Sequence, residues 1–308
     1  MSISIVLNQL ITLFLMMGLG FVLFRFQIMP KDFNRQLTKL LLNVTMPALI
    51  INSVLTVSEK ASGGKVFFIL LLAIGMYLLL PVLGSLIAKL LFVPKKQFGL
   101  YVFMTVFSNV GFMGFPLISA LLGNEAVFYT ALFNIIFNLS AYSYGILLIH
   151  YGTENSVKLN FRFLLSPGIL LSLFAVIIYF ADIRFPQSVA NAISSIGNLT
   201  TPLAMLIIGA SLGSMNLKEV FSDWRVYPYT ILKQLVLPIA LFPLLKLFIH
   251  DELLLGVTLI MLSVPVANTA VLFSTAYHAD EKLAARTVFI TTLSSLVTIP
   301  LVILLCLH

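Results

Sequence analysis

Apolar residues run along the whole chain in ten stretches, separated by short segments that hold most of the charged residues. Each stretch has about 17 or more residues, enough for an α-helix to cross about 30 Å of hydrocarbon. The pattern predicts an all-α integral membrane protein of ten transmembrane helices. The predicted spans are residues 3–24, 33–54, 65–92, 97–122, 124–150, 164–180, 187–212, 225–249, 252–277 and 281–306.

The composition supports a lipid environment and excludes several function classes. Of the 308 residues, 60% are hydrophobic and 9% are charged, against about 25% charged residues in soluble domains. No Lys or Arg precedes the first stretch, so we expect it to remain as a membrane helix and not to be removed as a signal peptide. The only cysteine, Cys306, leaves no disulfide framework and no thiol metal site. Without a phosphate-binding glycine loop or a catalytic motif, the sequence predicts no cofactor and no enzyme.

The basic residues predict the orientation of the helices. Thirteen of them lie at one set of loops and adjoining helix ends, four lie at the other set, and Lys233 alone lies far from any span end. Cytoplasmic loops carry the excess of Lys and Arg, so both termini are predicted outside the cytoplasm of a cell-membrane protein. The net charge of +7 is then explained by the excess of basic residues in one set of loops, and it does not indicate nucleic-acid binding. The larger set is Arg25, Lys31, Arg35, Lys39, Lys89, Lys95, Lys96, Lys158, Arg162, Lys218, Arg225, Lys282 and Arg286; the smaller is Lys60, Lys65, Arg184 and Lys246.

An internal repeat divides the chain into two halves. Asn43–Pro47 matches Asn198–Pro202 at an offset of 155, and Leu80-Pro81 matches Leu237-Pro238 at an offset of 157. The alternative explanation is a chance match caused by the similar apolar composition of the two halves. Two matches in the same order and at nearly the same offset favour a duplicated five-helix unit instead. An odd number of helices inverts the second copy, as in secondary transporters. The predicted domains are residues 1–150, a linker at 151–163, and residues 164–308.

Two of the predicted helices contain breaking residues near their centres. The fourth contains the stretch Ser108–Pro116, with Gly111, Gly114 and Pro116, and the ninth contains Pro265, onto which an offset of 157 maps Ser108. Proline lacks an N–H donor and glycine tolerates non-helical angles, so we predict that both helices unwind there. The alternative is that the prolines only kink helices for packing.

The direction of the two broken helices predicts a binding site for an anion. The second half of each should begin near the midplane, with its backbone N–H groups and partial positive charge directed at one region. Asn109, Asn268 and Thr269 add neutral hydrogen-bonding groups beside it. Asn43 and Asn198 either face the same cavity or only bond to neighbouring helices.

Ionisable residues are almost absent from the middle of the spans. None of the 11 acidic residues lies there, which weakens mechanisms that need a buried carboxylate relay. Lys233 lies about eight residues into the eighth span, roughly 12 Å at 1.5 Å per residue. It either neutralises an anionic substrate or extends to the headgroups.

Five motifs stand in order along the chain: Leu42–Leu49, Asn109–Pro116, Pro202–Gly213, Val264–Ala270 and Tyr277–Ala285. This ordered set resembles the auxin efflux carrier family, which includes the plant PIN-FORMED carriers and bacterial malate permeases. The resemblance implies a ten-helix fold similar to bile-acid symporters and sodium/proton antiporters, with helices 1, 2, 6 and 7 as a scaffold. It also implies broken helices that cross at proline, here Pro116 and Pro265, and a carboxylate bound near Asn109 and Asn268.

These observations predict a secondary carrier of small organic anions that works by elevator-type alternating access as a homodimer. One alternative is a sodium- or proton-coupled symporter whose ion is held by unwound carbonyls. Another is a membrane sensor that transports nothing. The predicted binding residues are Asn109, Gly111, Gly114, Pro116, Pro265, Asn268, Thr269, Asn43, Asn198 and Lys233.

Overall fold

The computed structural model describes residues 3–55, 62–151, 167–181, 183, 185–215 and 220–307. Helices make up nearly all of this part of the chain, and the one β-bridge among its residues is the isolated pair Ser108–Val266. All of the predicted linker except Tyr151 lies outside the described residues.

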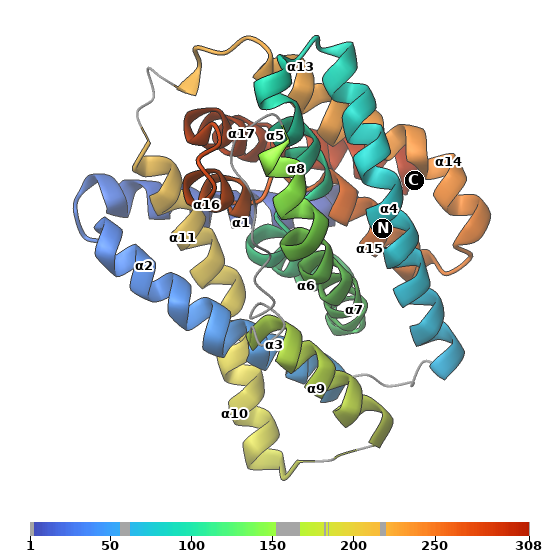
Figure 1. Ribbon diagram of the computed structural model, residues 1–308. Helices are drawn as coiled ribbons and strands as arrows, with labels where there is room; N and C mark the ends of the chain where they lie inside the picture. The colour runs from blue at the N-terminus through green and yellow to red at the C-terminus, as the bar shows by residue number, and fades with distance from the viewer. Residues whose placement is uncertain are drawn as a thin grey trace. The chain divides into compact units, whose positions relative to one another are not determined.

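The helices of the first half follow the predicted spans closely (Figure 1). They are α1 (Ile3–Arg25), α2 (Lys31–Leu40), the π-helical turn η1 (Leu41–Thr45), α3 (Met46–Leu55), α4 (Gly63–Leu90), α5 (Lys95–Val106), η2 (Val110–Gly114), α6 (Phe115–Leu122), α7 (Asn124–Ser140), η3 (Ala141–Gly145) and α8 (Ile146–His150).

The helices of the second half do the same. They are α9 (Pro167–Ala181), α10 (Gln187–Asn198), α11 (Thr200–Gly213), α13 (Val226–Ile231), η5 (Leu232–Val236), α14 (Leu237–Phe248), α15 (Glu252–Ser263), α16 (Thr269–Ala276) and α17 (Glu281–Cys306).

Among the residues that the structure describes, seven helical segments are long and apolar enough to cross a membrane by length and composition. The predicted fourth and ninth spans are instead divided into shorter helices, as the breaking residues suggested. The seven segments are Leu7–Arg25, Lys31–Leu55, Gly63–Leu90, Asn124–His150, Gln187–Gly213, Val226–Phe248 and Glu281–Cys306.

Local sequence signals mark the helix starts. The side chains of Asp251 and Asp280 accept hydrogen bonds from the backbone N–H groups of Leu254 and Leu283, both at 2.9 Å. These contacts satisfy donors that the first turn of a helix leaves without partners. Prolines stand directly before α2, α5 and α10, where a missing N–H costs least.

Three π-helical turns end two residues before a proline. Pro47, Pro116 and Pro238 are each the second residue of the α-helix that follows η1, η2 or η5. A proline ring clashes with the carbonyl four residues earlier, and the wider turn relieves this clash without ending the helix. The predicted break within Ser108–Pro116 therefore lies at the first residues of this stretch, because Gly111–Pro116 is π-helical and then α-helical.

The chain forms two compact units, and each draws on both halves of the sequence. Unit 1 comprises residues 1–70, 111–135 and 164–215, and unit 2 comprises residues 71–110, 136–163 and 216–308. The compact units therefore follow a different division from the repeat at residues 1–150 and 164–308. Unit 1 contains the first, second, sixth and seventh predicted spans, the four that the resemblance assigns to a scaffold.

In unit 1, close backbone contact joins α1 to α11. A Cβ atom at Gly209 would lie 1.8 Å from the carbonyl oxygen of Met17, and one at Gly20 would lie 2.2 Å from that of Leu206. Small residues that let helix backbones touch are typical of helix pairs in membranes. Elsewhere in the unit, α3 packs against both α9 and α10, and the three lie side by side at the bottom of Figure 1.

In unit 2, aromatic rings surround the end of α5. Phe107 stacks on Tyr77 and contacts the rings of Phe103, Phe137 and Tyr144, with centroids 4.6 to 6.3 Å apart. The hydroxyl of Tyr144 donates to the backbone carbonyl of Tyr77 at 2.6 Å. This cluster packs around the last turn of α5, directly before the backbone that follows the helix becomes extended.

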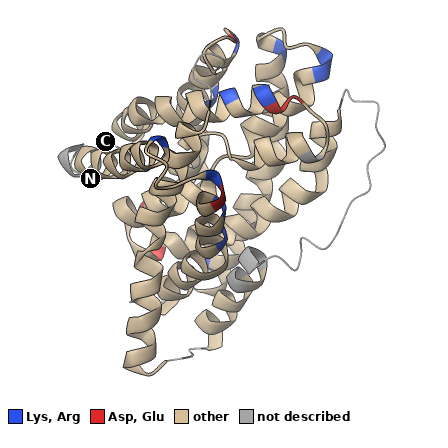
Figure 2. Ribbon diagram, turned by 90° about the vertical axis from the view of Figure 1, so that its left-hand side faces the viewer, with Lys and Arg blue, Asp and Glu red and all other residues tan. Residues whose placement is uncertain are grey.

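Charged residues gather at helix ends, and most of the ribbon carries none (Figure 2). The described acidic residues lie in first helical turns, at N-caps or in turns, which confirms for them the prediction that carboxylates avoid the middle of the spans. By contrast, Leu78, Val82 and Leu86, spaced by four on α4, are 62 to 65% exposed. Such an exposed apolar stripe suits contact with lipid.

Candidate functional site

Two interruptions in the helices of unit 2 pair with each other. Backbone Phe107–Asn109 follows α5, and Val264–Asn268 separates α15 from α16. The Asn109 N–H donates to the Pro265 carbonyl at 2.7 Å, and the Ala267 N–H donates to the Phe107 carbonyl at 3.1 Å. Ser108 and Val266 form an antiparallel bridge between these bonds. Each interruption thus supplies hydrogen-bond partners for backbone groups of the other. Non-helical backbone at membrane depth needs such partners from the protein itself.

The interruption in the predicted ninth helix coincides with the position predicted from Pro265. The one in the predicted fourth helix lies about two turns before Pro116. The physical reason is that proline fits the first turn of a helix, so Pro116 begins α6 and does not break it. The extended backbone occurs upstream, where a partner strand supplies its hydrogen bonds.

Lys233 and Gln234 hold the carboxyl end of α15. Both residues are 0% exposed and lie in η5. The Lys233 ammonium donates to the backbone carbonyl of Val264 and, at 3.5 Å, to that of Leu262. The Gln234 amide nitrogen is 3.5 Å from the Ser263 carbonyl. The last turn of a helix has carbonyls without hydrogen-bond partners and carries a partial negative charge. A cation placed there donates to the carbonyls and balances the charge.

The position of Lys233 excludes one of its two sequence-based interpretations. A side chain that extends to the headgroups would be partly exposed at its tip, whereas this one is fully buried and ends on backbone carbonyls. Whether it also contacts a substrate stays a prediction.

Thr291 of α17 completes the hydrogen bonding of the second interruption. Its hydroxyl accepts from the Val266 N–H at 3.2 Å and donates to the Thr287 carbonyl at 2.6 Å. Its own carbonyl accepts from the Gln234 amide at 3.0 Å. One threonine therefore connects η5, the interruption and α17.

Replacement of Thr291 by valine should lower the stability of this arrangement. The Val266 N–H would lose its acceptor inside the protein, at a cost of about 1–3 kcal/mol in the free energy of unfolding. Thr298→Val is the matched control on α17, because its buried hydroxyl makes no hydrogen bond to any described residue. Thermal unfolding in detergent should show a lower midpoint only for Thr291→Val. Equal midpoints for the two variants would show that the Val266 contact contributes nothing.

The amino end of α16 lies directly after this network. Asn268 occupies the N-cap position and makes no side-chain capping bond, and it is partly exposed. The buried Thr269 hydroxyl oxygen has no hydrogen-bond partner within the part of the chain that the structure describes. An uncapped helix start with a polar group lacking a partner is suited to an anion.

The remaining predicted residues lie elsewhere. Gly111, Gly114 and Pro116 belong to unit 1, and a Cβ at Gly111 would lie 3.7 Å from Met46. Asn43 and Asn198 are exposed in unit 1, and the Asn43 amide donates to the Lys39 carbonyl at 2.8 Å. Their part in binding stays a prediction.

Neither Gln234 nor Thr291 is among the residues that the sequence predicted for the site. Neither stands out by composition, because isolated Gln and Thr residues are common in membrane helices. The one available signal is that Gln234 follows Lys233 in an otherwise apolar stretch.

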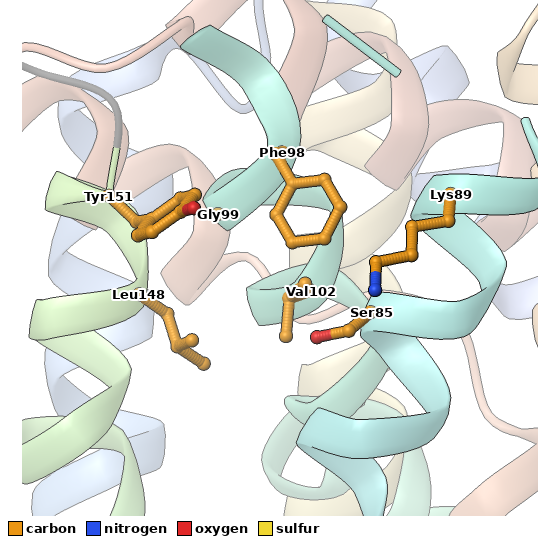
Figure 3. A pocket seen from close by; sticks show the side chains of 7 residues that line it. All are labelled: Ser85, Lys89, Phe98, Gly99, Val102, Leu148 and Tyr151. Atoms are coloured by element: carbon orange, nitrogen blue, oxygen red, sulfur yellow. The ribbon is translucent and has the colours of Figure 1, made fainter. Parts of the chain in front are cut away.

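A cavity also opens in unit 2, away from the interruptions. It has a volume of about 340 Å³ and lies between the end of α4, the start of α5 and the end of α8. In Figure 3 the lining ring of Phe98 lies in the middle of the view, with Lys89 and Ser85 to its right and Tyr151 and Leu148 to its left. None of the predicted binding residues lines it.

Comparisons with known proteins give the identity of the chain. A family described as membrane transport protein matches residues 5–161 and again 153–303. An uncharacterised transporter of Methanocaldococcus jannaschii is 25% identical over 287 residues, which cover 90% of this chain and 91% of the relative. One of Methanothermobacter thermautotrophicus is 23% identical over 299 residues, 92% of each chain. The chain thus belongs to the membrane transport protein family, which includes the auxin efflux carriers that its motifs resemble.

Proposed function

We propose that this multi-pass membrane protein is a secondary carrier of small organic anions such as carboxylates. The observation that carries the proposal is the start of α16, where Asn268 makes no side-chain capping bond and the buried Thr269 hydroxyl has no partner among the described residues. The positive end of the helix and neutral hydrogen-bond donors attract a carboxylate. They bind it at a smaller desolvation cost than a fixed buried cation would require.

In this proposal the residues of unit 2 have separate roles. Asn268 and Thr269 contact the anion, whereas Asn109 and Pro265 pair the two interruptions. Lys233, Gln234 and Thr291 keep the α15 end of the interruption in place. The interruptions then act as the crossing points of the two broken helices that the resemblance to the auxin efflux carriers implies.

The driving force we propose is the membrane potential acting on the charge of the substrate. It supplies about 2.3 kcal/mol per charge per 100 mV. No described acidic residue lies mid-span to bind a proton or a coupling ion. We further propose elevator-type alternating access, a homodimer, and a cell-membrane location with both termini outside the cytoplasm.

Flux measurements in reconstituted vesicles test this proposal. Vesicles with a potassium gradient and valinomycin should take up radiolabelled malate in a saturable manner, faster when the inside is positive, while protein-free vesicles should not. A carrier has to move the anion, so absence of flux for a panel of carboxylates would overturn the proposal. Tight carboxylate binding without flux would point to the sensor alternative, and stimulation by a sodium gradient at fixed voltage would point to a symporter.

A further inference from the structure

The carboxyl end of α15 forms a group of backbone oxygens directed at one positive charge. Leu262, Ser263 and Val264 are 0 to 3% exposed, and their carbonyls accept bonds from the Lys233 ammonium and the Gln234 amide. Beside them, the side-chain oxygen of Gln234 is buried and has no hydrogen-bond partner among the described residues. This buried region is therefore rich in oxygen acceptors, and Lys233 supplies its cation.

Such an oxygen group has the chemistry of a site for a monovalent cation. Secondary transporters hold coupling ions with unwound carbonyls and with the negative ends of half-helices. Hard cations prefer oxygen ligands of this kind. The acidic residues described in unit 2 lie at helix starts or in turns, so the ammonium is the group that balances the partial negative charge at this end of α15.

We propose that the Lys233 ammonium is a tethered substitute for a coupling cation and permanently occupies an alkali-ion site formed by the carbonyls of α15. The site requires no free Na⁺ or K⁺, because the chain supplies a single positive charge with three donors. One consequence of this proposal, that anion transport is independent of sodium, rests on the proposed carrier function. The site itself exists whether or not the protein transports carboxylates.

Removal of the ammonium should expose the site to ions from solution. In Lys233→Ala the carbonyls of Leu262 and Val264 lose their donor, and truncation of the side chain leaves space for an ion and water. We expect this variant to unfold at a lower temperature than wild type in N-methylglucamine chloride. Na⁺ or K⁺ at equal ionic strength should then raise its midpoint by about 3 °C or more, with saturation, because a ligand that binds only the folded state stabilises it.

Three controls separate ion binding from other effects. Wild type should show no difference between Na⁺ and N-methylglucamine. Lys233→Met fills the space with an apolar chain and should not respond to either ion. Lys246→Ala removes an exposed lysine of α14, and its midpoint should equal that of wild type in every salt.

The proposal is overturned if Na⁺ stabilises wild type, or if folded Lys233→Ala shows no ion-specific shift. If Lys233→Ala does not fold, wild type decides the question: sodium-dependent stabilisation or sodium-stimulated uptake at fixed voltage contradicts the proposal, and their absence supports it. The thermal shift is measured without substrate, so a protein that shows no carboxylate flux can still pass this test. Failure of the carrier proposal and failure of the cation-site proposal are therefore distinguishable.

Discussion

Malate uptake by vesicles containing Asn268→Ala is expected to fall about tenfold or more below that of wild type. Asn268 stands at the uncapped start of α16 and makes no capping bond of its own. A hydrogen bond to a charged group contributes about 1.5–3 kcal/mol, and about 1.4 kcal/mol corresponds to a tenfold change in affinity. The loss should appear mainly as a higher half-saturation concentration, with a smaller change in maximal rate.

Asn191→Ala is the matched control for this measurement. Asn191 is also an asparagine of a membrane span, but it is exposed and its side-chain oxygen accepts from the Gln187 amide in its own helix at 2.9 Å. We expect uptake within about twofold of wild type, because a contact of this kind contributes at most about 0.5–1.5 kcal/mol to folding. Equal uptake by both variants would remove Asn268 from the site.

Gly209→Ala is expected to give the largest loss of stability in unit 1. The new Cβ would lie 1.8 Å from the Met17 carbonyl oxygen and 2.8 Å from the Phe21 backbone nitrogen, both in α1. These are backbone atoms, so α1 and α11 have to separate to admit one methyl group. Overpacking costs about 1–3 kcal/mol and occasionally more, and we expect at least the upper value here. Alanine gains only about 0.5–1 kcal/mol over glycine within a helix.

Gly18→Ala provides the control for helix propensity. A Cβ at this position in α1 meets nothing within 4 Å, so the variant should equal or exceed wild type in thermal midpoint. Gly209→Ala should instead show a lower midpoint and a smaller yield of monodisperse protein in size-exclusion chromatography. Similar behaviour of the two variants would show that α1 and α11 are not in close backbone contact.

Hydropathy alone located the helical segments, because a helix in lipid must be apolar over its whole length. The prediction of residues 281–306 matches Glu281–Cys306, and that of residues 124–150 matches the described helical segment Asn124–His150. Proline and glycine correctly identified the two spans that are interrupted. Within Ser108–Pro116 they did not single out Ser108 and Asn109 as the residues that leave the helix, because a proline also fits the first turn of a helix and a π-helical turn relieves its clash.

The sequence by itself also singled out Lys233, since it is the one charge far from any predicted span end. Its partners were decided only by tertiary structure, which brings η5 against the end of α15 and directs the ammonium to the Val264 carbonyl. The hydrogen bonds of Gln234 and Thr291 were likewise decided only by the tertiary structure. Backbone carbonyls and N–H groups are present at every residue, so no pattern of side chains reveals which of them lack a helical partner. That depends on where each helix ends and which segment packs beside it.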